Sequence, residues 1–164
     1  MNEQTVIKVG MADLNIATDG NILKTTGLGS CVGMTIYDPI AKVAGMAHVM
    51  LPSSEIARET TINIAKYADT AIPELIERMA GVGAVLRRSV VKMAGGAQMF
   101  AFSGQSDSLR IGPRNVESCL AMATRYSLPI IAQDVGGNYG RTIEIDSRSG
   151  ILTIRSVQLG VKEI

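Results

Sequence analysis

The stretch Cys31-Val-Gly-Met-Thr-Ile-Tyr-Asp-Pro-Ile-Ala-Lys-Val-Ala-Gly-Met-Ala-His-Val-Met50 decides the fold, because it contains two apolar runs divided by a turn. The first run, residues 32–37, ends at Asp38-Pro39, since proline has no N–H to give to a strand ladder. The second run covers residues 42–50. Apolar residues on both alternating faces are typical of strands buried on both sides. The stretch therefore predicts a buried β-hairpin with a short loop at residues 38–41.

Further strand and helix patterns flank this hairpin. Alternating or apolar runs predict additional strands, and apolar residues at helical spacing predict two helical regions. The predicted strands cover residues 5–9, 13–17, 22–26, 89–93, 128–132, 142–146 and 151–155. The last two of these strands form a second hairpin around residues 147–150. Hairpins at both ends of the chain, rather than a regular alternation of strands and helices, predict an α+β fold.

The first helical region runs from about Asn63 to the glycines at 81 and 83, after a polar loop at residues 53–62. It contains Pro73, which predicts a kink or two helices that meet near Asp69–Thr70, with Pro73 in an early turn. The second helix opens at Ile111, and Pro113 suits its first turn.

Length and composition limit the classes of protein. The chain has 164 residues, of which 46% are hydrophobic and 4% aromatic, and we expect one domain over residues 1–164. The formal net charge is +1 and basic residues do not cluster, which argues against nucleic acid as a partner. No secretory signal or run of roughly 20 apolar residues is present, so we expect a cytoplasmic protein that does not insert into membranes.

Cys31 and His48 are the candidate catalytic pair. Cys31 lies in the glycine-rich segment Gly27-Leu-Gly-Ser-Cys-Val-Gly33, and His48 is the only histidine of the chain. A strand, a turn and a return strand would bring the two side chains together, and an imidazole beside a thiol is the usual way to obtain a reactive thiolate. A third group should orient the imidazole. Thr25 and Thr26 are both available, and strand alternation allows only one of them to face the site.

Other kinds of site are not supported by the sequence. The glycine spacing at residues 27–33 does not fit a dinucleotide fingerprint, and one histidine with two distant cysteines cannot form a structural zinc site. We therefore expect no cofactor and no metal. Backbone N–H groups of the glycine-rich turn, at Gly29, Ser30 and Val32, are candidates to hold an oxyanion. Cys119 falls on the apolar stripe of the second predicted helix and is interpreted as a core residue.

Several motifs resemble the CheD family of chemoreceptor glutamine deamidases. These are Thr25-x-Gly-Leu-Gly-Ser-Cys31, Gly45-Met-Ala-His48, Lys92-Met-Ala-Gly-Gly-Ala97, Ile111-Gly-Pro-Arg-Asn115 and Asp134-x-Gly-Gly-Asn-x-Gly-Arg141. The resemblance implies two packed mixed or antiparallel sheets with helices outside, as in a glutamine-deamidating toxin. It implies Cys31 as nucleophile, His48 as general base and Thr25 as the third member. It also implies methyl-accepting chemotaxis receptors as substrate and the CheC phosphatase as a partner.

Three alternatives stay open at this point. The same acyl chemistry would also hydrolyse a glutamate methyl ester. A regulatory module that docks to receptors and to CheC, with little catalysis, is a second possibility, and Gly95, Gly96 and Phe100 are the candidate docking residues. A thiol redox sensor is the third and weakest, because no resolving cysteine lies near Cys31 in the sequence.

Overall fold

The computed structural model describes residues 3–99 and 110–164. The described chain forms strands, two α-helices and three short 3₁₀ helices. The strands are β1 (Val6–Lys8), β2 (Leu14–Ala17), β3 (Ile22–Leu28), β4 (Val32–Asp38), β5 (Val43–Val49), β6 (Val90–Gly95), β7 (Ile130–Val135), β8 (Arg141–Asp146), β9 (Leu152–Ser156) and β10 (Gly160–Glu163). The helices are η1 (Ser54–Ile56), η2 (Ile64–Lys66), α1 (Ala68–Ala80), η3 (Leu86–Arg88) and α2 (Ile111–Arg125).

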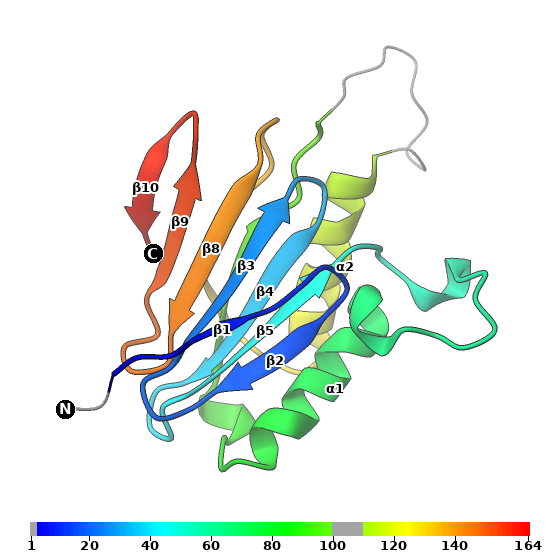
Figure 1. Cartoon of the computed structure of the whole chain (residues 1–164). Helices are drawn as coiled ribbons and strands as arrows, with labels where there is room; N and C mark the ends of the chain where they lie inside the picture. The colour runs from blue at the N-terminus through cyan, green and yellow to red at the C-terminus, as the bar shows by residue number, and fades with distance from the viewer. Residues whose placement is uncertain (1–2, 100–109) are drawn as a thin grey trace.

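The strands form two five-stranded sheets that pack on each other. The first sheet has the order β1-β3-β8-β9-β10 and the second the order β2-β5-β4-β6-β7. Each sheet contains one parallel pair, β1 with β3 and β6 with β7, and its other pairs are antiparallel. Figure 1 shows both α-helices on the face of the second sheet that is turned away from the first. The predicted α+β fold with two packed mixed sheets and outer helices is confirmed.

The predicted hairpin is the centre of this arrangement. Strands β4 and β5 pair antiparallel, and every residue of both strands is buried. Both strands lie inside the second sheet, which is covered by the helices on one face and by the first sheet on the other. The Asp38 carboxylate closes the loop by accepting the N–H groups of Ile40 and Ala41 and by pairing with Arg88 at 2.8 Å. Burial alone would raise the pKa of Asp38, but these partners outweigh it and hold the pKa at about 2.

Alternating residues of the hairpin contribute to two cores. In β5, Val43, Ala47 and Val49 pack toward the helices, whereas Ala44 and Met46 pack between the two sheets. The period-2 alternation therefore turns His48 toward the first sheet, into the layer between the sheets. The helices and the second sheet thus enclose one core. The functional side chains lie in the other core, between the two sheets.

The first helical region begins differently from the prediction. Helix α1 starts at Ala68, where the Tyr67 carbonyl accepts the N–H of Ala71, and the preceding turn, η2, is a separate 3₁₀ helix. The predicted division into two helices is therefore confirmed, although they meet at Tyr67 rather than near Asp69–Thr70. Pro73 lies inside α1, in its second turn, where its missing N–H leaves the Asp69 carbonyl without the usual helical donor. The loop at 53–62 also contains the short helix η1.

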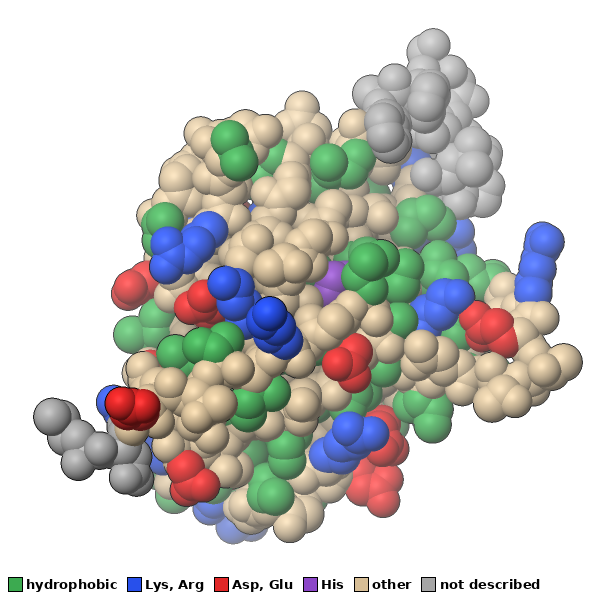
Figure 2. Space-filling model, in the orientation of Figure 1, with side chains coloured by type: hydrophobic (Ala, Val, Ile, Leu, Met, Phe, Trp, Pro, Cys, Tyr) green, Lys and Arg blue, Asp and Glu red, His purple; other side chains and the backbone are tan. Residues whose placement is uncertain are grey.

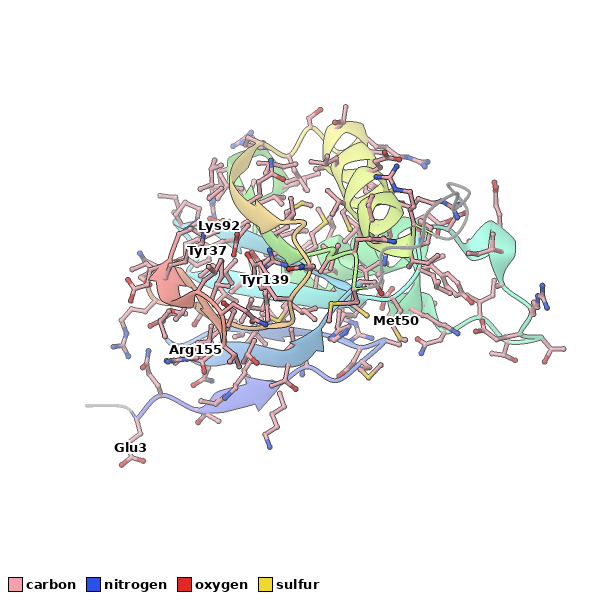
Figure 3. All side chains as sticks on the ribbon, turned by 90° about the horizontal axis from the view of Figure 1, so that it is seen from above. Glu3, Tyr37, Met50, Lys92, Tyr139 and Arg155 are labelled. Atoms are coloured by element: carbon pink, nitrogen blue, oxygen red, sulfur yellow. The ribbon has the colours of Figure 1, made fainter. Side chains whose placement is uncertain are left out.

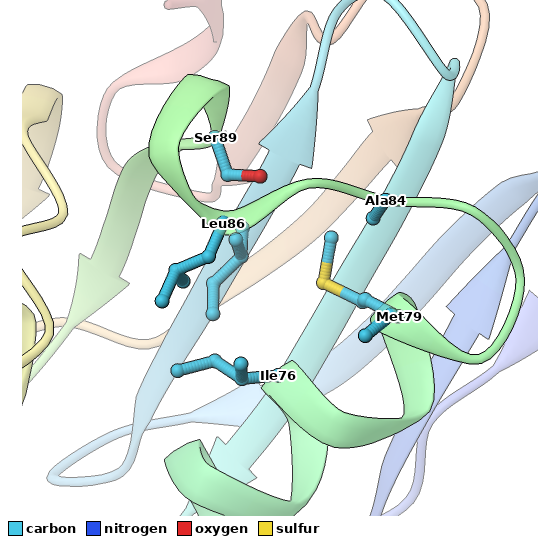
Figure 4. A pocket seen from close by; sticks show the side chains of 7 residues that line it. Ile76, Met79, Ala84, Leu86 and Ser89 are labelled. Atoms are coloured by element: carbon cyan, nitrogen blue, oxygen red, sulfur yellow. The ribbon is translucent and has the colours of Figure 1, made fainter.

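An apolar pocket lies under the end of α1, lined by Ile76, Met79, Ala84 and Leu86 among others, and Figure 4 shows these side chains turned toward one another. On the face shown in Figure 2, acidic and basic side chains are scattered rather than gathered by sign. Among the described residues, no helix has the length and apolar character needed to cross a membrane.

Candidate active site

The hairpin register brings Cys31 and His48 to the same face of the second sheet. His48 pairs with Gly33, and Cys31 lies two residues before Gly33 on the same strand face. Cys31 and His48 are therefore diagonal neighbours across the hairpin, at a spacing that long side chains bridge. Gly33 carries no side chain, and a Cβ at this position would collide with the Ile143 side chain of the first sheet. The first sheet thus packs closely over Gly33, which lies between Cys31 and His48 on this face.

Thr25 fixes the orientation of the imidazole from the opposite sheet. Its Oγ1 lies 2.7 Å from His48 Nδ1 and donates to the Val9 carbonyl at 2.7 Å. A hydroxyl has one proton, and here that proton is used by Val9. The Thr25 oxygen must then accept from His48, so Nδ1 carries the imidazole proton. This contact also answers the choice between Thr25 and Thr26: Thr25 is buried in the layer, whereas Thr26 is exposed.

The other ring nitrogen of His48 is consequently an unprotonated base. His48 is fully buried, and among the described residues its Nε2 has no hydrogen-bond partner. A buried acceptor without a partner costs stability and calls for an explanation. An Nε2 lone pair on the same strand face as Cys31 is what a general base for that thiol requires.

Burial keeps both groups neutral at rest. Desolvation raises the pKa of the Cys31 thiol, although the N–H of Cys31 itself opposes this effect. Desolvation lowers the pKa of His48, against the attraction of nearby Asp13. The sequence predicts a thiolate held by an imidazole, whereas the folded environment favours a thiol beside a neutral imidazole. The proton would then move during the reaction rather than before it.

The segment that follows β6 holds the turn at residues 29–31, called the nucleophile turn below. The N–H of Gly96 donates to the Cys31 carbonyl at 2.8 Å, and the N–H of Ala97 donates to the Gly29 carbonyl at 2.9 Å. A Cβ on Gly95 would collide with the Cys31 carbonyl. Gly95 and Gly96 are buried against the turn, which leaves these two residues little surface for the predicted docking. Phe100, the third residue of that prediction, lies outside the described residues.

The predicted oxyanion donors differ in availability. The N–H of Gly29 donates to the Gly27 carbonyl at 3.1 Å. Val32 pairs with Val49, and because the neighbouring His48 N–H points away to Asp13, the Val32 N–H belongs to the ladder with β5. Within the described residues, the N–H of Ser30 and the N–H of Cys31 have no acceptor apart from the Cys31 sulfur. Of the three predicted oxyanion donors, Ser30 therefore remains available, and the N–H of Cys31, which was not among them, is a second candidate.

Sequence reasoning missed one buried side chain next to the site. Asn115 of α2 is fully buried, and its Nδ2 donates to the carbonyls of Ser30 and Met50, each at 3.0 Å. Its only signal in the sequence was its place in the motif at residues 111–115. By contrast, Cys119 lies in the core beneath α2 as predicted, and burial raises the pKa of its thiol to about 12.

Figure 3 shows Met50 well to the right of Tyr37 and Lys92, on the side of the loop that follows β5. Met50 lies two residues after His48, and its carbonyl accepts from the same Asn115 amide as the Ser30 carbonyl, so the site lies on this side of the molecule. Among the described residues, no three His, Cys, Asp or Glu side chains come together as a possible set of metal ligands.

Known proteins resemble this chain over almost its whole length. The family model described as "CheD chemotactic sensory transduction" matches residues 50–156. A protein of Halalkalibacterium halodurans named "Chemoreceptor glutamine deamidase CheD" is 51% identical, with 97% of this chain and 98% of that protein covered. A Geobacillus kaustophilus protein named "Probable chemoreceptor glutamine deamidase CheD" is 47% identical over the full length of both chains. A Bacillus licheniformis protein named "Chemoreceptor glutamine deamidase CheD" is 44% identical, with 99% and 96% covered.

Proposed function

The chain belongs to the CheD family, and we propose that it hydrolyses glutamine side chains of methyl-accepting chemotaxis receptors to glutamate in the cytoplasm, with Cys31 as nucleophile. The observation that supports this proposal most is the hydrogen-bond series from His48 Nδ1 to Thr25 Oγ1 to the Val9 carbonyl. It leaves the His48 Nε2 lone pair free on the face that carries Cys31. The names of the relatives supply the substrate class.

In the first half of the reaction, the amide is exchanged for a thioester. His48 Nε2 takes the thiol proton while the Cys31 sulfur attacks the carboxamide carbon of the glutamine. The carbonyl oxygen becomes an oxyanion, which the N–H groups of Ser30 and Cys31 stabilise. His48 then gives its proton to the departing nitrogen, the C–N bond breaks, and ammonia leaves. During these transfers, Thr25 keeps Nδ1 protonated and holds the ring in place.

In the second half, water releases the product. His48, neutral again, takes a proton from a water molecule that attacks the thioester carbon, and the C–S bond breaks with return of the proton to sulfur. The sum of both halves is one amide and one water consumed, with one glutamate and one ammonia formed. No cofactor takes part in this proposal. Each event places a new negative charge on a receptor helix, which is how the modification would alter signalling in adaptation.

Burial also shields the Cys31 thiol from solvent until the substrate arrives. Cys31 is 7% exposed and His48 is fully buried, so an approaching glutamine side chain must enter the layer between the sheets. In this buried layer, a low dielectric strengthens the hydrogen bonds to the oxyanion. The alternative of a docking module with little catalysis stays a prediction, and burial of Gly95 and Gly96 gives it no support from those two residues. CheC binding and hydrolysis of glutamate methyl esters stay predictions from the resemblance and from shared acyl chemistry.

The proposal is tested with a purified receptor cytoplasmic fragment, by mass mapping of its peptides and by measuring ammonia. The wild-type chain is expected to convert particular glutamines to glutamate and to release ammonia in equal amount. Cys31→Ala is expected to do neither. Conversion by the Cys31→Ala variant at the wild-type rate would refute the nucleophile, and no conversion by the wild-type chain would refute the substrate class.

A further inference from the structure

Asn115 joins three parts of the molecule that meet at the site. It lies in the second turn of α2, and its Nδ2 donates both protons, one to the Ser30 carbonyl just before the nucleophile and one to the Met50 carbonyl just after β5. The side chain is fully buried. One amide therefore ties the helix to the turn that holds Cys31 and to the strand that holds His48.

The bond to Ser30 fixes the direction of the Cys31 N–H. In a trans peptide the C=O and the following N–H point in opposite directions. The Ser30 carbonyl is directed at α2 by Asn115, so the Cys31 N–H is directed away from the helices. That direction is toward the layer between the sheets, where the Cys31 side chain also lies. The N–H accordingly lies near the Cys31 sulfur, and it is one of the two free donors of the turn.

The peptide units on either side are held by the backbone alone. Ala97 N–H fixes the Gly29 carbonyl, and Gly96 N–H fixes the Cys31 carbonyl. Of these three successive peptide units, the one between Ser30 and Cys31 is held by a side chain, that of Asn115. Its orientation is therefore open to change by a single substitution.

The orientation of the Asn115 amide is set by its neighbours. A flipped amide would place Oδ1 against two carbonyl oxygens, so Nδ2 must face Ser30 and Met50. Within the described residues, Oδ1 is then a buried acceptor with no partner. Burying such an atom costs stability, which a purely structural residue would avoid.

We propose that Asn115 is a positioning residue of the deamidation reaction: it holds the Ser30–Cys31 peptide so that the Cys31 N–H faces the developing oxyanion. Its donation to the Ser30 carbonyl also polarises that peptide and makes its N–H a better donor. The role rests on the proposed function, because the oxyanion arises only in acyl chemistry. It is separate from the proton transfers made by His48.

The test compares Asn115→Asp with a control on the same helix. Aspartate keeps the shape but has no proton to give when ionised and only one, for two carbonyls, when burial keeps it protonated. Ser118→Ala is the matched control, since Ser118 Oγ donates to the Pro52 carbonyl at 2.6 Å and, among the described residues, makes no hydrogen bond to residues 29–31. With a receptor fragment as substrate, Asn115→Asp is expected to lower kcat about 10- to 100-fold and leave KM within about threefold. Ser118→Ala is expected to keep kcat near the wild-type value.

A second readout does not depend on turnover. The rate at which iodoacetamide alkylates Cys31 should fall in Asn115→Asp across neutral pH, because the N–H that stabilises the thiolate is misdirected. If the wild-type chain releases no ammonia from receptor fragments, the proposed function fails, and the alkylation rate still tests the geometry. A folded Asn115→Asp variant with wild-type kcat, or with unchanged alkylation, overturns the proposal, as does an equal loss of kcat in Ser118→Ala.

If Asn115→Asp does not fold, the wild-type chain provides the test. A receptor peptide carrying glutamate semialdehyde at the target position adds the Cys31 thiol across its carbonyl, which forms a C–S bond and leaves an oxygen at the oxyanion position. The Cys31 amide proton is expected to move downfield in the NMR spectrum as it bonds to that oxygen. An unmoved Cys31 resonance, with adduct formation proved by mass, overturns the proposal.

Discussion

Replacing Thr25 by valine removes one hydroxyl from the site and almost nothing else, because the two side chains have similar shape. In the wild-type chain, that hydroxyl makes two buried contacts of 2.7 Å, one with His48 Nδ1 and one with the Val9 carbonyl. After the substitution, the Nδ1 proton has no partner in a fully buried ring. The ring then loses its preference for the tautomer with a basic Nε2, and its orientation is no longer fixed.

The size of the effect follows from the contact that is lost. Leaving a buried donor unpaired costs about 1–3 kcal/mol. If this cost falls on the reactive tautomer, kcat is expected to decrease about 5- to 150-fold, at 1.36 kcal/mol for each factor of ten. Two unpaired groups, His48 Nδ1 and the Val9 carbonyl, should also lower the free energy of unfolding by on the order of 3 kcal/mol.

The assay is ammonia release from a receptor cytoplasmic fragment, measured at saturating substrate and at a temperature where circular dichroism shows the variant folded. Thr25→Ser is the matched control, because it keeps the hydroxyl and should retain kcat within several-fold of wild type. A folded Thr25→Val variant with kcat within twofold of wild type would refute the reasoning. So would equal losses in the valine and serine variants, since the hydroxyl would then not be the cause.

Three further predictions follow from the same geometry. Gly95→Ala should lower both kcat and the free energy of unfolding, because its Cβ collides with the Cys31 carbonyl. Gly83→Ala, at a similar positive φ but with open space around it, should lower the free energy of unfolding alone, and equal kcat values in the two variants would contradict this. Burial lowers the pKa of His48 in the folded protein, so the stability that its neutral form contributes is present above about pH 6.5 and is lost as the pH falls through the lower folded pKa. The difference in melting temperature between wild type and His48→Gln should therefore shrink over this pH range. Cys119→Ala should leave kcat unchanged while lowering the melting temperature, and a loss of activity in folded protein would show a role outside the core.

The hairpin was predictable because its signals are local. Two apolar runs and Asp38-Pro39 define strands and turn within 20 residues of sequence, and the strand alternation places Cys31 and His48 on one face. Strand β10, at residues 160–163, was not predicted, because its residues are all exposed and show no alternation. It forms only through pairing with β9, which is a property of the folded sheet.

The rest of the site depends on contacts between distant segments. From the residues alone, Thr25 and Thr26 were equivalent, and only the packing of β3 over β5 separates them. Gly95 and Gly96 have the composition of a loop, yet they are buried because the Cys31 turn closes over them. The predicted charge states of Cys31 and His48 differ from those that the fold favours. A thiol next to an imidazole suggests a thiolate, but burial, which no local pattern reveals, favours the neutral pair.

The central claim is that Thr25 holds the His48 ring with its proton on Nδ1, so that Nε2 is a free base for Cys31. With one histidine in the chain, ¹⁵N NMR of histidine-labelled protein reports on this ring without assignment. Above neutral pH, we expect one protonated and one unprotonated nitrogen signal, with the proton on Nδ1, and loss of that preference in Thr25→Val. A proton on Nε2, or a doubly protonated ring at pH 7.5, would contradict the account.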